Sequence, residues 1–128
     1  MNTTYTDEEA RHVSSILKHY AHAKEKHPYF CDIVLPDFGS SLRKKKEAYA
    51  CALRSSRISI VAEIHNNTLS WETLIDCEIW EVLNALINGD TAHAIEELHD
   101  CIAVCLRTID VLEGRQKLGR PETKGEGK

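Results

Sequence analysis

The stretch SWETLIDCEIWEVLNALINGDTAHAIEELHDCIAVCLRTIDVLE, residues 70–113, decides the fold of this chain. Apolar residues recur at helical spacing on both sides of a short break at Gly89 and Asp90. Ser70 is a suitable N-cap for the first helix, because its hydroxyl can accept from the free N–H groups of the opening turn. Gly89 suits the left-handed residue that ends that helix, and Asp90 or Thr91 can cap the next one. So short a connection predicts an antiparallel helical hairpin.

Four carboxylates occupy matched positions on the two predicted helices. Glu78 and Glu81 are three residues apart, so they project from one face of the first helix. Glu97 and Asp100 repeat this spacing on the second helix. Glu81 lies about eight residues before the turn and Glu97 about eight after it, which places both roughly 12 Å along the hairpin. Two acidic pairs should therefore come level with each other across the seam between the helices.

These acids interrupt stripes that are otherwise apolar. At about 100° per residue, the first pair brackets the direction of Leu74 and Ala85, and the second pair shares its stripe with Val104. Glu96 points instead to the polar side of its helix, and we assign it to solvent. Carboxylates in an apolar stripe are costly and repel one another unless a cation is bound among them. An all-oxygen cluster suits a hard divalent ion, so Mg²⁺ is the expected cofactor and Mn²⁺ the alternative.

Two short motifs carry a resemblance to a known family. EIWE at residues 78–81, fifteen intervening residues and ELHD at residues 97–100 resemble the E-x-x-E … E-x-x-D signature of the MazG-like all-α nucleoside triphosphate pyrophosphohydrolases. The resemblance covers residues 70–113 well and the rest of the chain loosely. It implies an all-α, four-helix bundle built around the hairpin, and Mg²⁺-dependent hydrolysis of a (d)NTP to a (d)NMP and pyrophosphate.

The motif match also implies roles for individual residues. Glu78, Glu81, Glu97 and Asp100 would bind the metal, and Glu78 or Glu81 would act as the general base. Many members of the family carry a further acid where this chain has Cys77, so the number of metal ions stays open. The resemblance also implies a homo-oligomer, either a dimer or a tetramer, with a pocket shared between subunits.

Other parts of the chain suggest what the substrate would be. HAKEKHPYFCD, residues 22–32, is similar to the N-terminal element of the phage-associated dATP/dGTP diphosphohydrolase branch of this family, which implies dGTP or dATP. A triphosphate needs cationic partners beyond a metal. A basic run at residues 43–46 lies near a predicted helix start, where a solvated surface is the alternative explanation. The substrate-binding candidates are Lys44, Arg54 and Arg107, with Arg57 comparable to them, and Trp71, which could stack a base or simply pack at an edge.

Composition predicts one domain over residues 1–113 and a disordered tail over residues 114–128. The net charge of −4 and the lack of a dense basic face argue against binding to nucleic acid. No apolar run approaches membrane-spanning length, so we expect no membrane partner. Five cysteines without a C-x-x-C motif favour a reducing compartment and a cytoplasmic protein. A capping box at Thr6 opens one further predicted helix, and another begins near Ser40 or Ser41.

Two other kinds of function compete with the hydrolase. A ferritin-like di-iron oxidase would use the E-x-x-H spacing that occurs twice in this chain. Its ligands would be Glu9 with His12, Glu96 with His99, and Glu63 with Glu78 or Glu81. A non-catalytic helical interaction module would need none of these acids in particular. The response of the protein to Mg²⁺, its response to Fe²⁺ and the effect of replacing a single acid would distinguish the hydrolase, the di-iron oxidase and the interaction module.

Overall fold

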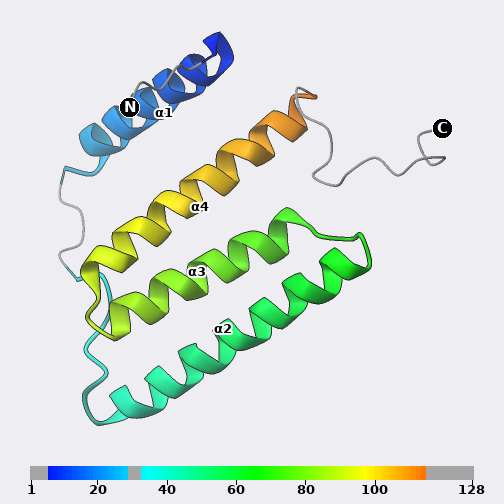
Figure 1. Cartoon of the computed structure of the whole chain (residues 1–128). Coiled ribbons are helices and arrows are strands. Elements are labelled where there is room, and N and C mark those ends of the chain that lie inside the picture. Colours follow the sequence, from blue (N-terminus) through cyan, green and yellow to red (C-terminus); the bar gives the residue numbers. More distant parts are fainter. Residues whose placement is uncertain (1–5, 29–32, 115–128) are drawn as a thin grey trace. The chain divides into compact units, whose positions relative to one another are not determined.

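A computed structural model describes residues 6–28 and 33–114 of the chain (Figure 1). The predicted disordered tail lies almost entirely outside the described residues, as do residues 29–32 of the segment that resembles the dATP/dGTP branch. Four α-helices and one short 3-10 helix account for the regular structure, and no strand occurs within these two ranges. The all-α prediction is confirmed.

The chain divides into two compact units, Met1–Pro36 and Asp37–Lys128. The first contains helix α1, Asp7–Lys26. Its N-terminus carries the predicted capping box, in which Glu9 N–H donates to the Thr6 hydroxyl at 3.0 Å and Thr6 N–H donates to Glu9 Oε1 at 2.8 Å. The participation of this helix in a four-helix bundle, and the single domain over residues 1–113, stay predictions.

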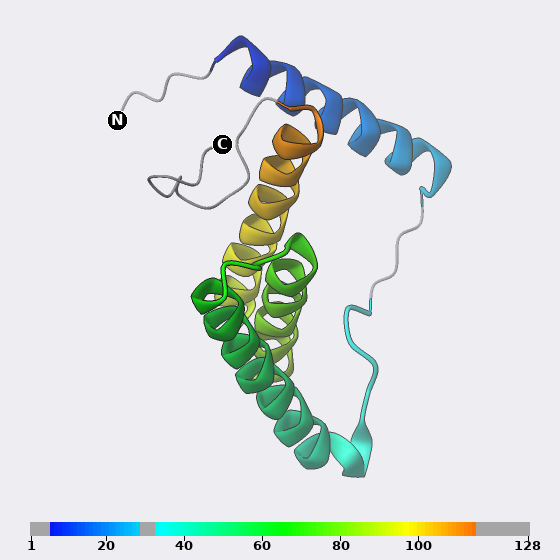
Figure 2. The same cartoon turned by 90° about the vertical axis from the view of Figure 1, so that its right-hand side faces the viewer.

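The second unit contains the 3-10 helix η1, Gly39–Ser41, followed by α2, Leu42–His65, α3, Trp71–Ile87, and α4, Thr91–Leu112. Short connections make each helix antiparallel to the next, and α3 packs against both α2 and α4 (Figures 1 and 2). Residues 70–113 therefore form the predicted hairpin, and α2 forms a third helix along its side. Among the described residues, no helix combines the length and the apolar content needed to cross a membrane.

The turn between α3 and α4 has the geometry that its sequence predicts. Gly89 has a φ of +77°, a backbone conformation that costs an L-residue energy because of its Cβ. Gly89 N–H donates to the Leu86 carbonyl at 3.1 Å and Asp90 N–H to the Ala85 carbonyl at 2.8 Å, which is the Schellman pattern. Asp90 Oδ1 then accepts from His93 N–H at 3.1 Å and caps α4. The length of this turn sets the register of the two acidic helices.

The start of α3 is tied to the end of α2. Ser70 Oγ accepts from Thr73 N–H at 3.2 Å, as predicted for an N-cap. Glu63 on α2 reinforces this cap, because its Oε1 accepts from Ser70 N–H at 3.3 Å and its Oε2 from the Thr73 hydroxyl at 2.6 Å. Asn67 ends α2 in the left-handed region with a φ of 59°. The turn between α3 and α4 and the start of α3 are thus both held by local hydrogen bonds.

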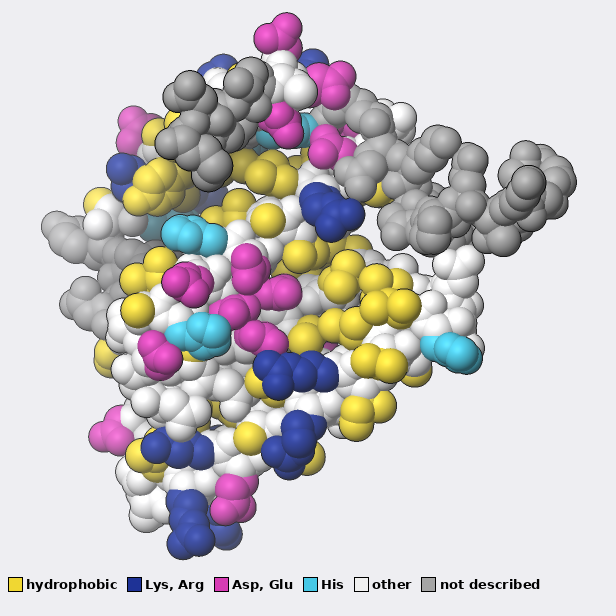
Figure 3. Space-filling model, in the orientation of Figure 1, with side chains coloured by type: hydrophobic (Ala, Val, Ile, Leu, Met, Phe, Trp, Pro, Cys, Tyr) yellow, Lys and Arg dark blue, Asp and Glu magenta, His cyan; other side chains and the backbone are white. Residues whose placement is uncertain are grey.

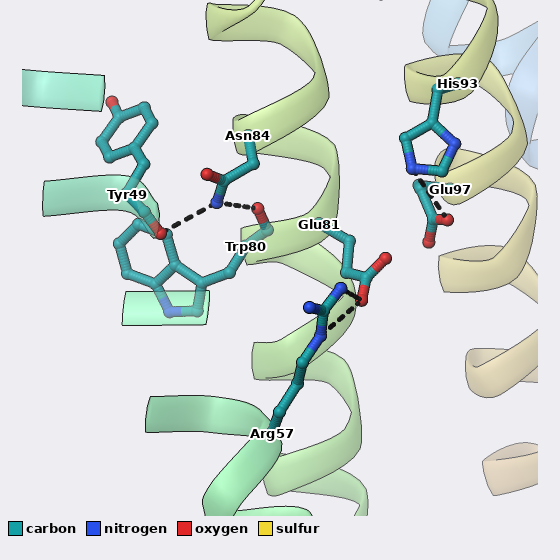
Figure 4. A network of polar contacts seen from close by, with 7 residues as sticks. All are labelled: Tyr49, Arg57, Trp80, Glu81, Asn84, His93 and Glu97. Carbon is teal, nitrogen blue, oxygen red and sulfur yellow. Dashed lines mark hydrogen bonds and ion pairs between the residues drawn. The ribbon is translucent and has the colours of Figure 1, made fainter. Parts of the chain in front are cut away.

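A small core holds the three helices together. Its buried apolar side chains come mostly from α3 and are those of Cys77, Val82, Ala85, Ile87 and Ala94. Trp80 is half-buried and packs beside Tyr49 of α2, with ring centroids 5.6 Å apart. Asn84 joins the same two helices, because its Nδ2 donates to the carbonyls of Tyr49 and Trp80 at 2.8 Å each (Figure 4).

Large apolar side chains remain exposed on both outer helices of this unit. On α2 they are Leu42, Ile58, Val61 and Ile64, and on α4 they are Ile95, Leu98, Ile102, Ile109 and Leu112. Three helices bury too little surface to cover all of these residues. Apolar surface therefore stays exposed on α2 and α4.

Candidate metal centre

The seam between α3 and α4 brings together three of the four predicted acids. One carboxylate oxygen each from Glu78, Glu97 and Asp100 lies within 4.8 Å of the others. The matched distances from the turn at Gly89 explain this convergence, since both pairs are displaced equally along antiparallel helices. Acidic side chains gather on one face of the molecule, with basic side chains beside them toward α2 (Figure 3).

Glu81, the fourth predicted acid, belongs to a second group of three. One oxygen each from Glu81 and Glu97 and one ring nitrogen of His93 lie within 4.8 Å of one another. Glu97 is common to both groups. The predicted four-acid cluster is therefore better described as two adjoining groups that share a central carboxylate.

Asp100 is exposed, but burial makes the carboxylates of Glu78 and Glu97 costly in the absence of a cation. Glu97 is only 9% exposed, and the Oε2 atom of Glu78 is buried with no hydrogen-bond partner among the described residues. Burial, reinforced by a hydrogen bond with Glu97 and by its negative charge, raises the pKa of Glu78 to about 7. Burial and the charge of Glu81 likewise raise the pKa of Glu97. The cluster lacks positive charge at its centre, which is where a divalent cation would lower its energy.

A cation does reach the outer edge of the cluster. Arg57 on α2 donates to Oε1 of Glu81 from Nη2 at 2.7 Å and from Nε at 3.3 Å (Figure 4). This pairing raises the pKa of the Arg57 guanidinium. The arginine side chain is 58% exposed, so it faces solvent beside the acids. Among the described residues, Arg57 is the cationic candidate from the sequence that contacts the cluster.

The other predicted substrate-binding residues lie on exposed surface. Lys44 and Arg54 are exposed on α2, Trp71 is exposed in the first turn of α3, and Arg107 is exposed on α4. None of these four makes a salt bridge with the acids in the described part of the chain. Their role in binding substrate stays a prediction.

His93 is the residue that sequence reasoning missed. Its Nε2 lies 3.5 Å from Oε1 of Glu97, four residues further along α4. The available signal was the spacing itself, because residues i and i+4 share a helix face. Glu96 is exposed as predicted, and His99, three residues further along the same helix, is exposed as well.

Cys77, the position at which the predicted family resemblance would place an additional acid, has the environment of a packing residue. The side chain is buried, and burial raises the pKa of its thiol. A neutral buried thiol behaves as a small apolar group. It contributes to the core between α3 and its neighbours.

The ligand set of a di-iron oxidase is not assembled in the second unit. Both carboxylate oxygens of Glu63 are engaged at the start of α3, by Ser70 and Thr73. Glu96 and His99 are exposed and belong to neither group of possible metal ligands in the described ranges. Glu9 accepts a hydrogen bond within its own capping box on α1.

Comparison of the chain with protein-family models, with curated proteins and with solved structures finds no match in any of the three. No family membership is shown. The resemblance to MazG-like enzymes therefore depends on the acidic motifs, and the geometry of the acids has to be judged by its own chemistry.

Proposed function

We propose that this protein is a Mg²⁺-dependent nucleotide pyrophosphohydrolase, which converts a (d)NTP and water to a (d)NMP and pyrophosphate. The observation that supports this most strongly is the convergence of Glu78, Glu97 and Asp100 across the α3–α4 seam. Their spacing along the chain is that of the MazG-like signature, and their side chains meet in one place. The family resemblance and the local chemistry thus lead to the same proposal.

The residues present fit a divalent cation. Glu78, Glu97 and Asp100 offer hard oxygen ligands, and Glu81 adds a fourth carboxylate next to them. Hard cations such as Mg²⁺ and Mn²⁺ prefer this donor set and keep several waters. When Glu78 is ionised, its buried Oε2 has no hydrogen-bond donor among the described residues, so a bound cation would stabilise it.

The chain's own groups can then serve the hydrolysis. A bound Mg²⁺ would offset the charge of the phosphates and lower the pKa of the attacking water. The carboxylate of Glu78 or of Glu81 would accept the proton of that water, as a base must lie within hydrogen-bond reach of it. Arg57, exposed and adjacent to Glu81, would provide a planar pair of donors for phosphate oxygens.

The finer predictions belong to the same proposal. A purine deoxynucleotide, dGTP or dATP, is the expected substrate because of the similarity at residues 22–32. A homo-oligomer, dimer or tetramer, would cover the apolar side chains that stay exposed on α2 and α4. Its interface would enclose a pocket that three helices leave open.

The test is a panel of all eight (d)NTPs with Mg²⁺, in which pyrophosphate and orthophosphate are measured separately. We expect pyrophosphate and a nucleoside monophosphate in equal amounts, with no release when Mg²⁺ is removed by EDTA. Orthophosphate as the sole product would contradict cleavage between the α and β phosphates.

Two neighbouring glutamates on α4 provide a matched pair of variants. Glu97→Gln removes the carboxylate shared by both groups and should abolish turnover, whereas Glu96→Gln changes an exposed side chain one residue earlier and should preserve it. If Glu97→Gln hydrolyses nucleotides as fast as Glu96→Gln, the assigned site is wrong. A protein that neither hydrolyses any nucleotide nor gains thermal stability from Mg²⁺ would be the non-catalytic helical module.

A further inference from the structure

We propose that His93 is a nitrogen ligand of a second cation subsite, which it forms with Glu81 and Glu97. This subsite would take a transition-metal dication, such as Zn²⁺ or Fe²⁺, in preference to Mg²⁺. The inference rests on the proposed metal centre and extends it, because the sequence motifs account for carboxylate ligands alone.

The geometry brings three potential ligand atoms together from two helices. His93 Nε2 lies 3.5 Å from Glu97 Oε1, and a carboxylate oxygen of Glu81 lies within 4.8 Å of both partners' ligand atoms. Figure 4 shows the imidazole directed at Glu97 on α4, with Glu81 facing them from α3. Ligands around a zinc ion at about 2.0–2.1 Å lie closer together than this, so small side-chain rotations would close the site.

Arg57 leaves part of Glu81 accessible to a cation. Both of its hydrogen bonds fall on Oε1 of Glu81. The other oxygen of that carboxylate lies on the side of His93 and Glu97 (Figure 4). Glu81 can therefore remain paired with Arg57 through Oε1 and still offer its other oxygen to a cation.

Two observations separate the metal centre as a whole, one in this subsite and one in the adjoining group, from an ordinary acidic surface. The shared ligand Glu97 is nine-tenths buried, so its charge is shielded from bulk water. Oε2 of Glu78, in the adjoining group, is buried and has no hydrogen-bond partner in the described structure. A buried unsatisfied carboxylate oxygen costs free energy that a ligand can recover.

The imidazole decides which cation the subsite selects. Carboxylates and water suit Mg²⁺, Ca²⁺ and Mn²⁺, whereas imidazole nitrogen suits zinc and iron. The group Glu78, Glu97 and Asp100 offers oxygen alone, and the group with His93 offers one nitrogen and two oxygens. Each group would thus prefer a different class of cation, with Glu97 between them.

The test uses full-length, metal-free, reduced protein with ¹⁵N-labelled histidine, titrated with Zn²⁺. Long-range ¹H–¹⁵N spectra report each imidazole nitrogen, and we expect the His93 Nε2 resonance to move on addition of Zn²⁺. His93→Ala identifies that resonance and should weaken Zn²⁺ binding by at least about tenfold, because even outer-sphere partners of metal ligands contribute that much. Mg²⁺ affinity should change far less.

His99→Ala is the matched control, since it removes an exposed imidazole from the same helix and keeps every cysteine. An unmoved His93 resonance, or equal Zn²⁺ affinities for His93→Ala and His99→Ala, would overturn the inference. If the protein releases pyrophosphate but the His93 resonance does not move on addition of Zn²⁺, this inference is refuted and the proposed function stands. A moved His93 resonance without nucleotide hydrolysis would support the subsite and refute the proposed function.

Discussion

Replacing Glu78 by glutamine should remove a pH dependence of stability that the buried carboxyl imposes on the metal-free protein. Burial first, and then the hydrogen bond with Glu97 and its negative charge, raise the pKa of Glu78 from 4.5 to about 7. The folded state consequently holds this proton more tightly than the unfolded chain. The resulting stabilisation is fully present below pH 4.5 and is lost as the pH rises through 7.

The magnitude follows from the size of that shift. A rise from 4.5 to about 7 corresponds to about 3 kcal/mol between the two ends of the pH range. Glutamine has nearly the same shape and does not titrate, so Glu78→Gln should be more stable than the wild type by up to about 3 kcal/mol at pH 8. At pH 5 the two proteins should differ by less than about 1 kcal/mol on the same reasoning.

Urea denaturation in EDTA at pH 5 and at pH 8, followed by helical circular dichroism, measures both differences. Glu96→Gln is the control, because that side chain is exposed and should leave the pH dependence of the wild type unchanged. If the stability of Glu78→Gln falls with pH as steeply as that of the wild type, the burial argument for the acidic cluster is refuted. Added Mg²⁺ should stabilise the wild type more at pH 8 than at pH 5, since the ligating carboxylates must be deprotonated.

Four other outcomes follow from the structure. Ser70→Ala should lose about 1 kcal/mol of stability in urea, because the α3 cap is removed, and Ser59→Ala on exposed α2 surface should lose far less. Gly89→Ala should lose about 1–2 kcal/mol through backbone strain alone, since nothing lies within 4 Å of an added Cβ, and Gly89→Asn should lose less. Arg57→Ala should cost less than about 1 kcal/mol in the same denaturation assay, because the guanidinium that pairs with Glu81 is exposed to solvent. Light scattering after size exclusion should give a mass at least twice that of one chain, and a monomer would refute the proposed oligomer.

Local signals predicted the helices and their ends well. The caps at Thr6, Ser70 and Asp90 and the left-handed Gly89 each depend on residues within four positions of one another, so the sequence carries them directly. The level placement of the acidic pairs also followed from counting residues from a tight turn. Such predictions need no knowledge of how distant segments pack.

The parts of the site that were not predicted depend on packing between helices. The approach of Arg57 to Glu81 requires α2 to lie beside α3 at one register, which no local pattern determines. From the sequence, His93 looks like a surface histidine. It becomes a possible metal ligand only because Glu97, which lies beside it, is buried. Burial of Glu97 in turn results from the close fit of α4 against α3. Tertiary contacts therefore supplied the second group of ligands.

The turn at Gly89 fixes the positions of the acids along both helices, because each acid lies a set number of residues from it. Each acid is found by counting outward from it, so inserting one residue in either helix between the turn and the acids would swing one pair about 100° away from the other. Adding a whole turn of helix to one side would keep the faces aligned but slide the pairs about 5.4 Å out of step. Only the addition of about two whole turns, or seven residues, to both helices would move the centre along the hairpin with both acidic pairs still facing the seam, because seven residues miss two turns by only about 20°.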